Sequence, residues 1–288
     1  MILVTGATGK TGRALVQELV SMGVAVRAVV RDRAKAADIA AAGAEIAVAD
    51  LSRAETLAAI FVGIDKAYLM TAADPQQVML HSNFISAAKQ AGVRHIVRHS
   101  VRGADPDSPI KLGRWHAISQ KELEDSGMVW THLQPVYNMQ NFLTFAATIQ
   151  SQRAFYAPMR DGALSMVDAR DVAAVAATTL VDDIHHRRKT YLITGPEALT
   201  FAEAAGQLSA VLGKPVRYTD VSREDARKAL LQRGMPEWYV EDLLGFYDFY
   251  STGAGAPVSD VVARITRQPG RRFRQFVQDY RSALTGLQ

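Results

Sequence analysis

Short apolar runs alternate with amphipathic stretches through the first half of the chain. These runs are mostly aliphatic, and polar or glycine residues follow them, as is typical of buried strands in a parallel sheet. The pattern predicts strands at Ile2–Val4, Val24–Val30, Glu45–Ala49, Lys66–Thr71 and His95–Ser100.

The stretches between these strands have the helical period. The first has Leu15, Leu19 and Met22 on one face and is followed by Gly23, which is typical of a helix and its end. Regular alternation of strands and helices predicts βαβ crossovers, and hence an α/β fold with a Rossmann-type, doubly wound parallel sheet. The predicted helices are Arg13–Met22, Ala34–Ala42, Ser52–Phe61 (with Ser52 and Glu55 as a capping box) and Val78–Ala91.

The pattern changes in the second half. A helix is predicted at His116–Ser126, a strand at Met128–Leu133, and short returning strands at Ser165–Val167 and Thr190–Ile193. After Gly195 the chain is predicted to be mostly helical. One helix has a Thr200–Glu203 capping box and ends at Gly213, the next is capped by Ser222, and another begins near Pro236.

This change predicts two domains. Residues 1–150 would form the dinucleotide-binding Rossmann domain, with the returning strands near 165–194. Residues 195–288 would form a smaller, mostly helical substrate-binding domain, with the substrate between the two. The aromatic stripe Tyr239, Phe246, Tyr247 and Tyr250 is interpreted as helical-domain core.

Composition narrows the function classes. The chain has 288 residues, no cysteine and a formal net charge of +4. Without cysteine there is neither a disulfide nor a thiolate site. Its basic residues are scattered, so we expect no nucleic-acid partner. No apolar run is long enough to cross a membrane, and a strand beginning at residue 2 leaves no room for a signal peptide, so we expect a cytoplasmic protein that binds no membrane.

The first turn of the chain contains two phosphate-binding patterns. Gly9-Lys10-Thr11 resembles the end of a nucleotide-triphosphate loop, but the glycine that such a loop needs five positions earlier is Val4 here. Gly6, Gly9 and Gly12 lie between a strand and a helix, where backbone N–H groups and the helix dipole favour a pyrophosphate. The sequence therefore favours a dinucleotide site, with Thr8, Lys10 and Thr11 also contacting the cofactor.

The end of the second strand bears on the choice of cofactor. In this fold an acidic residue there bonds the ribose 2′-hydroxyl, whereas an arginine accommodates a 2′-phosphate. The sequence "VVRDRAK" places Arg31, Arg33 and Lys35 around Asp32, which favours NADPH over NADH. An ordinary solvated loop is the alternative. Further cofactor contacts are predicted at the next strand ends, from Asp50, Leu51, Met70 and Thr71.

Several segments together resemble one family. They are "VTGATGKTGRALVQELV", "VVRDRAK", "AAKQAGVRHIVRHS", "DSGMVWTHLQPVYNMQNF", "SMVDARDVAAVAA" and "TYLITGPEALTFAEAAGQLSAVLGKPV". They resemble the NmrA-like branch of the atypical short-chain dehydrogenase/reductases, within it most closely the triphenylmethane-dye reductases and NADPH:quinone reductases. The resemblance covers nearly the whole chain. It implies NADPH as cofactor and hydride transfer as the reaction, although some relatives are non-catalytic redox sensors.

The chain departs from the wider superfamily at the proton donor. No tyrosine is followed four places on by lysine; Tyr156 with Arg160 comes closest. By the resemblance, Ser100 matches the family's serine and His116 falls on its lysine position, while Gln120 and Gln134 replace a glutamate and an arginine.

Three residues are given catalytic roles. By the resemblance, Ser100 would occupy the usual serine place, and His116 would bond the nicotinamide ribose or protonate an acceptor. Tyr137 and Asn138 follow a strand end and would bond the carboxamide or line the pocket, while Asn141 would orient that loop. Their alternatives are a helix-surface histidine and hydrogen bonds within a loop.

Two further polar clusters are interpreted structurally. Asp168 and Asp171 are expected to cap a helix, and His185-His186 with Asp182-Asp183 is assigned no metal because adjacent side chains do not converge.

The leading hypothesis is an NADPH-dependent reductase that transfers hydride to a quinone-like or aromatic electrophile. Such acceptors need little help from a protein acid because their reduced forms are stabilised, so the missing tyrosine is tolerated. The alternative is a non-catalytic NADP(H)-binding sensor; a sugar-nucleotide epimerase is disfavoured because it needs the missing acid. The expected partner is a small-molecule electrophile, and a homodimer is left open.

Overall fold

The computed structural model describes residues 1–286 and contains a sheet of seven parallel strands. The strand order is β3-β2-β1-β4-β5-β6-β8, so the direction of winding reverses between β1 and β4. This reversal is the point where doubly wound sheets bind ligands, beyond the carboxyl ends of the strands. The strands are β1 Ile2–Val4, β2 Val26–Val30, β3 Glu45–Val48, β4 Lys66–Leu69, β5 His95–His99, β6 Val129–Pro135 and β8 Lys189–Ile193.

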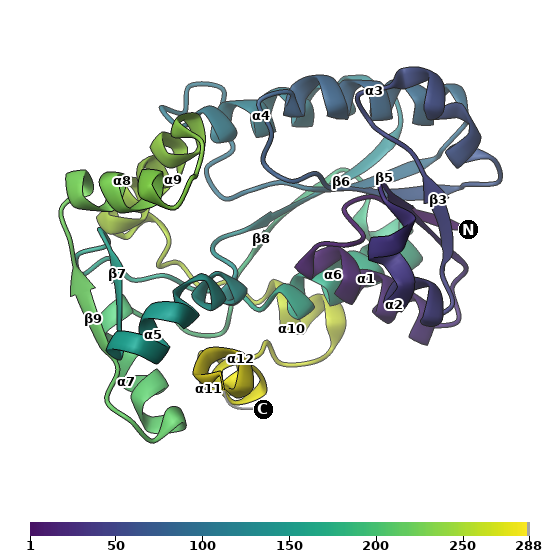
Figure 1. Cartoon of the computed structure of the whole chain (residues 1–288). Coiled ribbons are helices and arrows are strands. Elements are labelled where there is room, and N and C mark those ends of the chain that lie inside the picture. Colours follow the sequence, from purple (N-terminus) through teal and green to yellow (C-terminus); the bar gives the residue numbers. More distant parts are fainter. Residues whose placement is uncertain (287–288) are drawn as a thin grey trace.

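Helices cover both faces of this sheet (Figure 1). Neighbouring residues of β1 point to opposite faces, because side chains alternate along a strand. Ile2 and Val4 pack with α1, α2, α6 and α10, whereas Leu3 packs with α3 and α4. The predicted α/β doubly wound class is confirmed. The helices are α1 Lys10–Ser21, α2 Ala37–Ala41, α3 Gln77–Gln90, α4 Lys111–Asp125, α6 Ala169–Val181 and α10 Val261–Thr266.

A second apolar core lies beside the sheet, on the left of Figure 1. It is rich in aromatic rings, with Phe142 contacting Phe155, Phe201 and Phe273 edge to face. This core draws on residues 136–166 as well as on 199–284, so the domain boundary at 195 stays a prediction. Its elements include α5 Ala146–Gln152, α7 Phe201–Leu212, α8 Arg223–Gln232, α9 Glu237–Phe249, α11 Phe273–Asp279, α12 Arg281–Thr285, and the two-stranded sheet of β7 Ala154–Ala157 with β9 Arg217–Asp220.

Several predicted elements were wrong. The segment 165–167 forms an isolated bridge rather than a strand, and β7 and β9 were not predicted. The predicted helix 52–61 is instead two short 3₁₀ turns, Ala54–Thr56 and Ala58–Phe61. Its capping box does not form, because Ser52 bonds Asp50 and Glu55 pairs with Arg53. By contrast, the Thr200–Glu203 capping box is confirmed.

The helix predicted to begin at His116 begins five residues earlier, at Lys111. Its first N–H groups are capped from α9, where the Asp242 carboxylate accepts from the backbone N–H groups of Lys111 and Leu112. Asp168 caps α6 as predicted. Asp171 does not cap it; its carboxylate accepts from the backbone N–H and the guanidinium of Arg271 instead.

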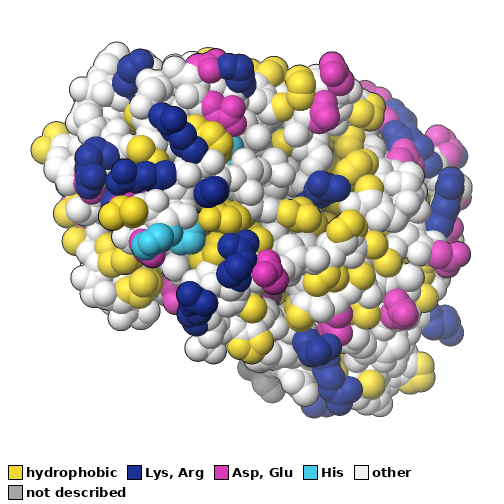
Figure 2. Space-filling view, turned by 180° about the vertical axis from the view of Figure 1, so that it is seen from behind, with side chains coloured by type: hydrophobic (Ala, Val, Ile, Leu, Met, Phe, Trp, Pro, Cys, Tyr) yellow, Lys and Arg dark blue, Asp and Glu magenta, His cyan; other side chains and the backbone are white. Residues whose placement is uncertain are grey.

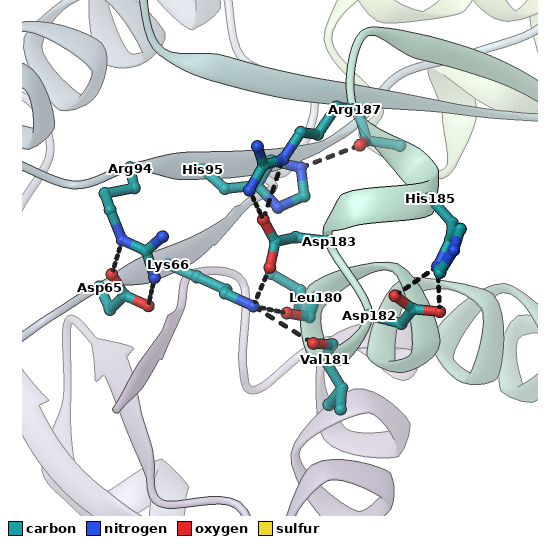
Figure 3. A network of polar contacts seen from close by, with 11 residues as sticks. Asp65, Lys66, Arg94, His95, Leu180, Val181, Asp182, Asp183, His185 and Arg187 are labelled. Carbon is teal, nitrogen blue, oxygen red and sulfur yellow. Dashed lines mark hydrogen bonds and ion pairs between the residues drawn. The ribbon is translucent and has the colours of Figure 1, made fainter.

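A polar network closes the amino ends of the strands, at the edge opposite the ligand-binding end (Figure 3). The Lys66 ammonium lies 2.7 Å from the Asp183 carboxylate and donates to the Leu180 carbonyl at the end of α6. Asp183 also pairs with Arg187, and Asp182 bonds His185. The Lys66 contacts therefore join the end of α6 and the loop after it to β4, while the other two pairs lie within that loop.

The surface is mixed in charge on the face seen in Figure 2, where a few basic side chains adjoin one another and the others are scattered among acidic and hydrophobic side chains. Within residues 1–286 no helix is both long enough and apolar enough to cross a membrane.

Candidate cofactor and substrate site

The turn after β1 packs tightly against the first helix. Gly6 has a φ of +63°, a conformation that glycine adopts readily, and its carbonyl accepts from the Gly9 N–H at 2.9 Å. A Cβ on Gly12 would lie only 2.1 Å from the Gly6 oxygen, so α1 can approach the turn only because residue 12 is a glycine. Gly9 is the N-cap of α1, and its side-chain-free backbone leaves the helix amino end open to an anion.

A cavity of about 390 Å³ opens at this turn. Its walls come from the carboxyl ends of β1, β2, β3 and β4, which parallel strands bring to one edge. The predicted cofactor residues that line it are Gly6, Thr8, Gly9, Arg31, Asp50, Leu51, Met70 and Thr71.

The remaining predicted cofactor residues of the turn lie outside this lining. Lys10 directs its ammonium to the Gln140 carbonyl at 2.8 Å, and burial lowers its pKa. Thr11 is buried within α1, and Gly12 acts through close packing rather than contact with the cavity.

In the basic loop after β2, too, some of the predicted residues line the cavity and others do not. The Arg33 guanidinium donates to the Ile46 carbonyl, and neither Arg33 nor Lys35 is among the residues that line the cavity. Asp32 is also used locally, because its carboxylate accepts from the Ala34 N–H as a helix cap. Arg31 is the basic residue of this loop that lines the cavity.

Asp50 faces the same cavity as a carboxylate. It accepts from the backbone N–H and the hydroxyl of Ser52 at 2.9 and 2.8 Å, and these hydrogen bonds lower its pKa. An ionised Asp50 can only accept hydrogen bonds, which suits an amino or hydroxyl group of a ligand.

A second cavity of about 250 Å³ adjoins the first, since Met70 and Thr71 line both. The predicted residues His116, Tyr137, Asn138 and Asn141 lie in its wall. The aromatic stripe consists of Tyr239, Phe246 and Tyr247 on α9 and of Tyr250, which follows the helix. All four line the cavity, and Tyr247 and Tyr250 are also buried in the second apolar core. The cavity is therefore flanked by aromatic rings, and its polar groups are hydroxyls, amides and imidazoles.

Burial raises the pKa of the Tyr137 phenol well above its usual value. The hydroxyl interacts with Tyr247 and Asn141, and the ring contacts Phe201 and Tyr250. Ser100, in contrast, is buried and bonds Gln120 at 2.5 Å, and it lies outside the lining of either cavity.

His116 is held from behind by an arginine that was not predicted as a site residue. The fully buried Arg98 of β5 directs one guanidinium nitrogen to His116 Nδ1 at 3.1 Å and to His81 Nδ1 at 3.2 Å. His81 Nε2 lies 3.0 Å from the Thr71 hydroxyl. Burial, together with the Arg98 charge, lowers the pKa of both histidines well below the usual value, so both are neutral at pH 7.

Two amide groups of the second cavity have buried atoms without a hydrogen-bond partner among the described residues. They are the Asn138 oxygen and the Gln77 nitrogen. An orphaned acceptor and an orphaned donor in one cavity suit a ligand that carries both kinds of group. The prediction missed Gln77, because nothing in the local pattern of α3 separates it from a surface glutamine.

Comparison with known proteins supports a single family. The model of the NmrA-like family matches residues 1–269. An NAD(P)H azoreductase of Xenophilus azovorans is 40% identical over 283 residues, which cover 98% of this chain and 99% of that protein.

Solved structures agree with this match. The NADPH complex of an Escherichia coli quinone oxidoreductase superposes with a TM-score of 0.88 at 30% identity, covering 97% of this chain and 99% of that one. A Citrobacter triphenylmethane reductase complexed with NADP(H) gives a TM-score of 0.86 at 28% identity, with 97% and 99% covered. The resemblance inferred from the sequence is confirmed.

Proposed function

Since the chain belongs to the NmrA-like family, we propose that it is an NADPH-dependent reductase that transfers hydride to a quinone-like or other aromatic electrophile. The observation that carries the proposal is the shared wall of the two cavities. Met70 and Thr71 line both, so a dinucleotide seated along the strand ends would present its nicotinamide to the aromatic cavity.

The residues present fit such a cofactor. Gly6, Gly9 and Gly12 leave room for a pyrophosphate at the amino end of α1, where a Cβ at residue 12 would displace the turn. Arg31 offers paired N–H donors to a 2′-phosphate. The orphaned Asn138 oxygen suits the amide N–H of a carboxamide.

When bound, NADPH supplies hydride from its nicotinamide C4 and leaves as NADP⁺, so the acceptor gains two electrons and one hydrogen and still needs one proton. The aromatic wall of Tyr239, Phe246 and Tyr250 would hold a flat acceptor and exclude water. His116, neutral and in the wall, would donate a hydrogen bond to the acceptor atom that gains charge.

The absent Tyr-x-x-x-Lys pair is consistent with this choice of acceptor. A ketone becomes a strongly basic alkoxide and needs a strong acid, whereas a quinone becomes a stabilised phenolate that water can protonate. The activities for which the relatives are named, azo and quinone reduction among them, support the same class of acceptor.

The proposal is tested by mixing the purified chain with NADPH and a panel of quinones, azo dyes and triphenylmethane dyes, and following loss of the dihydronicotinamide absorbance. Gly12→Ala should lose turnover by losing cofactor affinity. Gly206 lies at an exposed position of α7, where an added Cβ would have nothing within 4 Å, so Gly206→Ala should keep turnover. Tight NADPH binding without turnover of any acceptor would contradict the proposal and favour the sensor alternative.

A further inference from the structure

Arg98 is buried beneath the second cavity without an opposing carboxylate in hydrogen-bond contact. It is 0% exposed, and its Nε and Nη1 have no partner among the described residues. Burial lowers its pKa only to about 9, so the guanidinium is charged at pH 7. Glu122 acts on it through space, and His99 and His132 lie close enough to feel its charge. A buried charge is costly, and its retention here calls for a role.

The guanidinium fixes the protons of its neighbours. A guanidinium can only donate, so Nδ1 of His116 and of His81 must both accept, and each neutral ring must carry its proton on Nε2. The His81 Nε2–H then donates to the Thr71 oxygen, which leaves the Thr71 hydroxyl hydrogen free to point elsewhere. Because His116 and Thr71 both line the second cavity, the arrangement presents two donors to it.

The cavity is also one-sided in charge. Its lining contains tyrosines, amides, histidines and apolar side chains but no aspartate or glutamate within the part of the chain that the structure describes. Asp242 lies on α9, which lines the cavity, but its carboxylate accepts from the backbone N–H groups that begin α4. Arg102 acts through space on Tyr250 and Arg233 on Tyr247, and the charge in direct hydrogen-bond contact with His116 and His81 is the positive charge of Arg98.

We propose that Arg98 is a positioning residue that holds His116 and His81 in the Nε2–H form and makes the cavity select neutral acceptors that become anionic on reduction. The inference rests on the proposed function and deepens it. A quinone accepts hydride at oxygen or carbon, its carbon–oxygen π bond opens, and the electron pair comes to rest on an oxygen that faces His116 and Thr71. A cationic triphenylmethane dye instead becomes neutral on reduction. The positive charge of Arg98 repels such a dye, so removing that charge does not slow its reduction.

The size of the effect follows from the distance. From the guanidinium through the imidazole to a bonded oxygen is roughly 8 Å, and a unit charge at that distance changes a rate constant by roughly tenfold to thirtyfold at an effective dielectric of about 20. Arg98→Met should therefore lower kcat for a neutral quinone at least about tenfold, with a smaller change in KM. The same variant should leave unchanged, or raise, kcat/KM for a cationic dye.

The first arm of the test needs no substrate. ¹⁵N spectra of the wild-type histidine rings, assigned with His116→Gln and His81→Gln, should place the proton of both rings on Nε2. Arg98→Met should release His116 to a mixture of tautomers, and Arg98→Lys should keep the charge but lose the shared donor geometry. An Nδ1–H ring for His116 in the wild type would overturn the inference, whatever the activity assays give.

The second arm compares acceptors. Arg94→Met removes the same charge from the residue before β5, where the side chain is 60% exposed and paired with Asp65, and should leave the quinone-to-dye ratio unchanged. A fall in that ratio of at least about tenfold in Arg98→Met, with NADPH affinity retained, supports the inference. An unchanged quinone-to-dye ratio in a folded Arg98→Met protein overturns the inference. If the wild type turns over no acceptor, the proposed function is contradicted, and the histidine tautomers measured in the first arm still decide the role of Arg98.

Discussion

Mild acid should destabilise this protein well above the pH at which its carboxylates titrate. The cause is a set of buried histidines in and beside the sheet: burial lowers the pKa of His95 and of His99 to about 4, and that of His132 to about 3. In the unfolded chain each returns to the ordinary histidine value of about 6.5.

The sign follows from which state binds the proton. Between the folded and unfolded pKa values the unfolded chain takes up protons that the folded chain refuses, so the free energy of unfolding falls as pH falls. Integrated from about pH 7 to about pH 5, one such histidine lowers it by about 2 kcal/mol, so His95, His99 and His132 together lower it by about 5 kcal/mol. That loss is comparable to the whole stability of an ordinary domain, roughly 5–15 kcal/mol.

Urea unfolding followed by circular dichroism at a series of pH values measures this loss. His95→Gln removes one such group at the amino end of β5, outside the lining of either cavity, and its free energy of unfolding should fall by about 2 kcal/mol less over the same interval. His185→Gln, whose side chain is 75% exposed, is the control and should follow the wild type. An unfolding free energy that stays constant from pH 7 to pH 5 would refute the reasoning, because it would mean that these rings are protonated equally in both states.

The remaining predictions concern the cofactor turn, its specificity and the opposite edge of the sheet. Gly12→Ala should weaken NADPH binding at least about tenfold in calorimetry and lower the free energy of unfolding by about 1–3 kcal/mol, because the added Cβ would collide with the turn. The control Gly206→Ala should raise the free energy of unfolding by about 0.5–1 kcal/mol, and equal effects of the two substitutions would count against the proposed role of the turn. Arg31→Ala should weaken NADPH binding roughly tenfold or more and leave NADH binding unchanged, and a parallel loss of both would assign Arg31 another role. Asp183→Ala should lower the unfolding free energy by about 2 kcal/mol in urea, because it leaves the largely buried Lys66 ammonium without its carboxylate, and should leave NADPH affinity intact.

The fold was largely predictable because its strands and helices are strongly periodic and joined by short turns. The misses have a common physical cause. The start of α4 is capped by Asp242, about 130 residues away in sequence, and Gly113 near that start reads as a helix breaker although it is needed for close packing against Ser108. The strands β7 and β9 are short and pair with each other across about 60 residues, so neither has a local signal.

The site residues also fall into those that could be placed from the sequence and those that only the three-dimensional structure reveals. Arg31 and the glycine turn, which lie at the first cavity, could be placed there because they follow strand ends that are visible in the sequence, and their phosphate contacts stay a prediction. Tyr137 was placed by its position after a strand and His116 by the family resemblance, and both line the second cavity. The link from Arg98 through His81 to Thr71 joins a strand, a helix and a loop, so only the three-dimensional arrangement reveals it. A charged residue inside an apolar strand, as in "HIVRHS", was the one available signal.

The most direct measurement is a crystal structure of the NADPH complex. The predicted result is a 2′-phosphate at Arg31, the pyrophosphate at the amino end of α1, and the nicotinamide between Thr71 and the second cavity, within hydrogen-bond reach of Asn138. A cofactor bound elsewhere, or one whose nicotinamide points away from His116 and Tyr137, would contradict the assignment of this edge of the sheet as the site of hydride transfer.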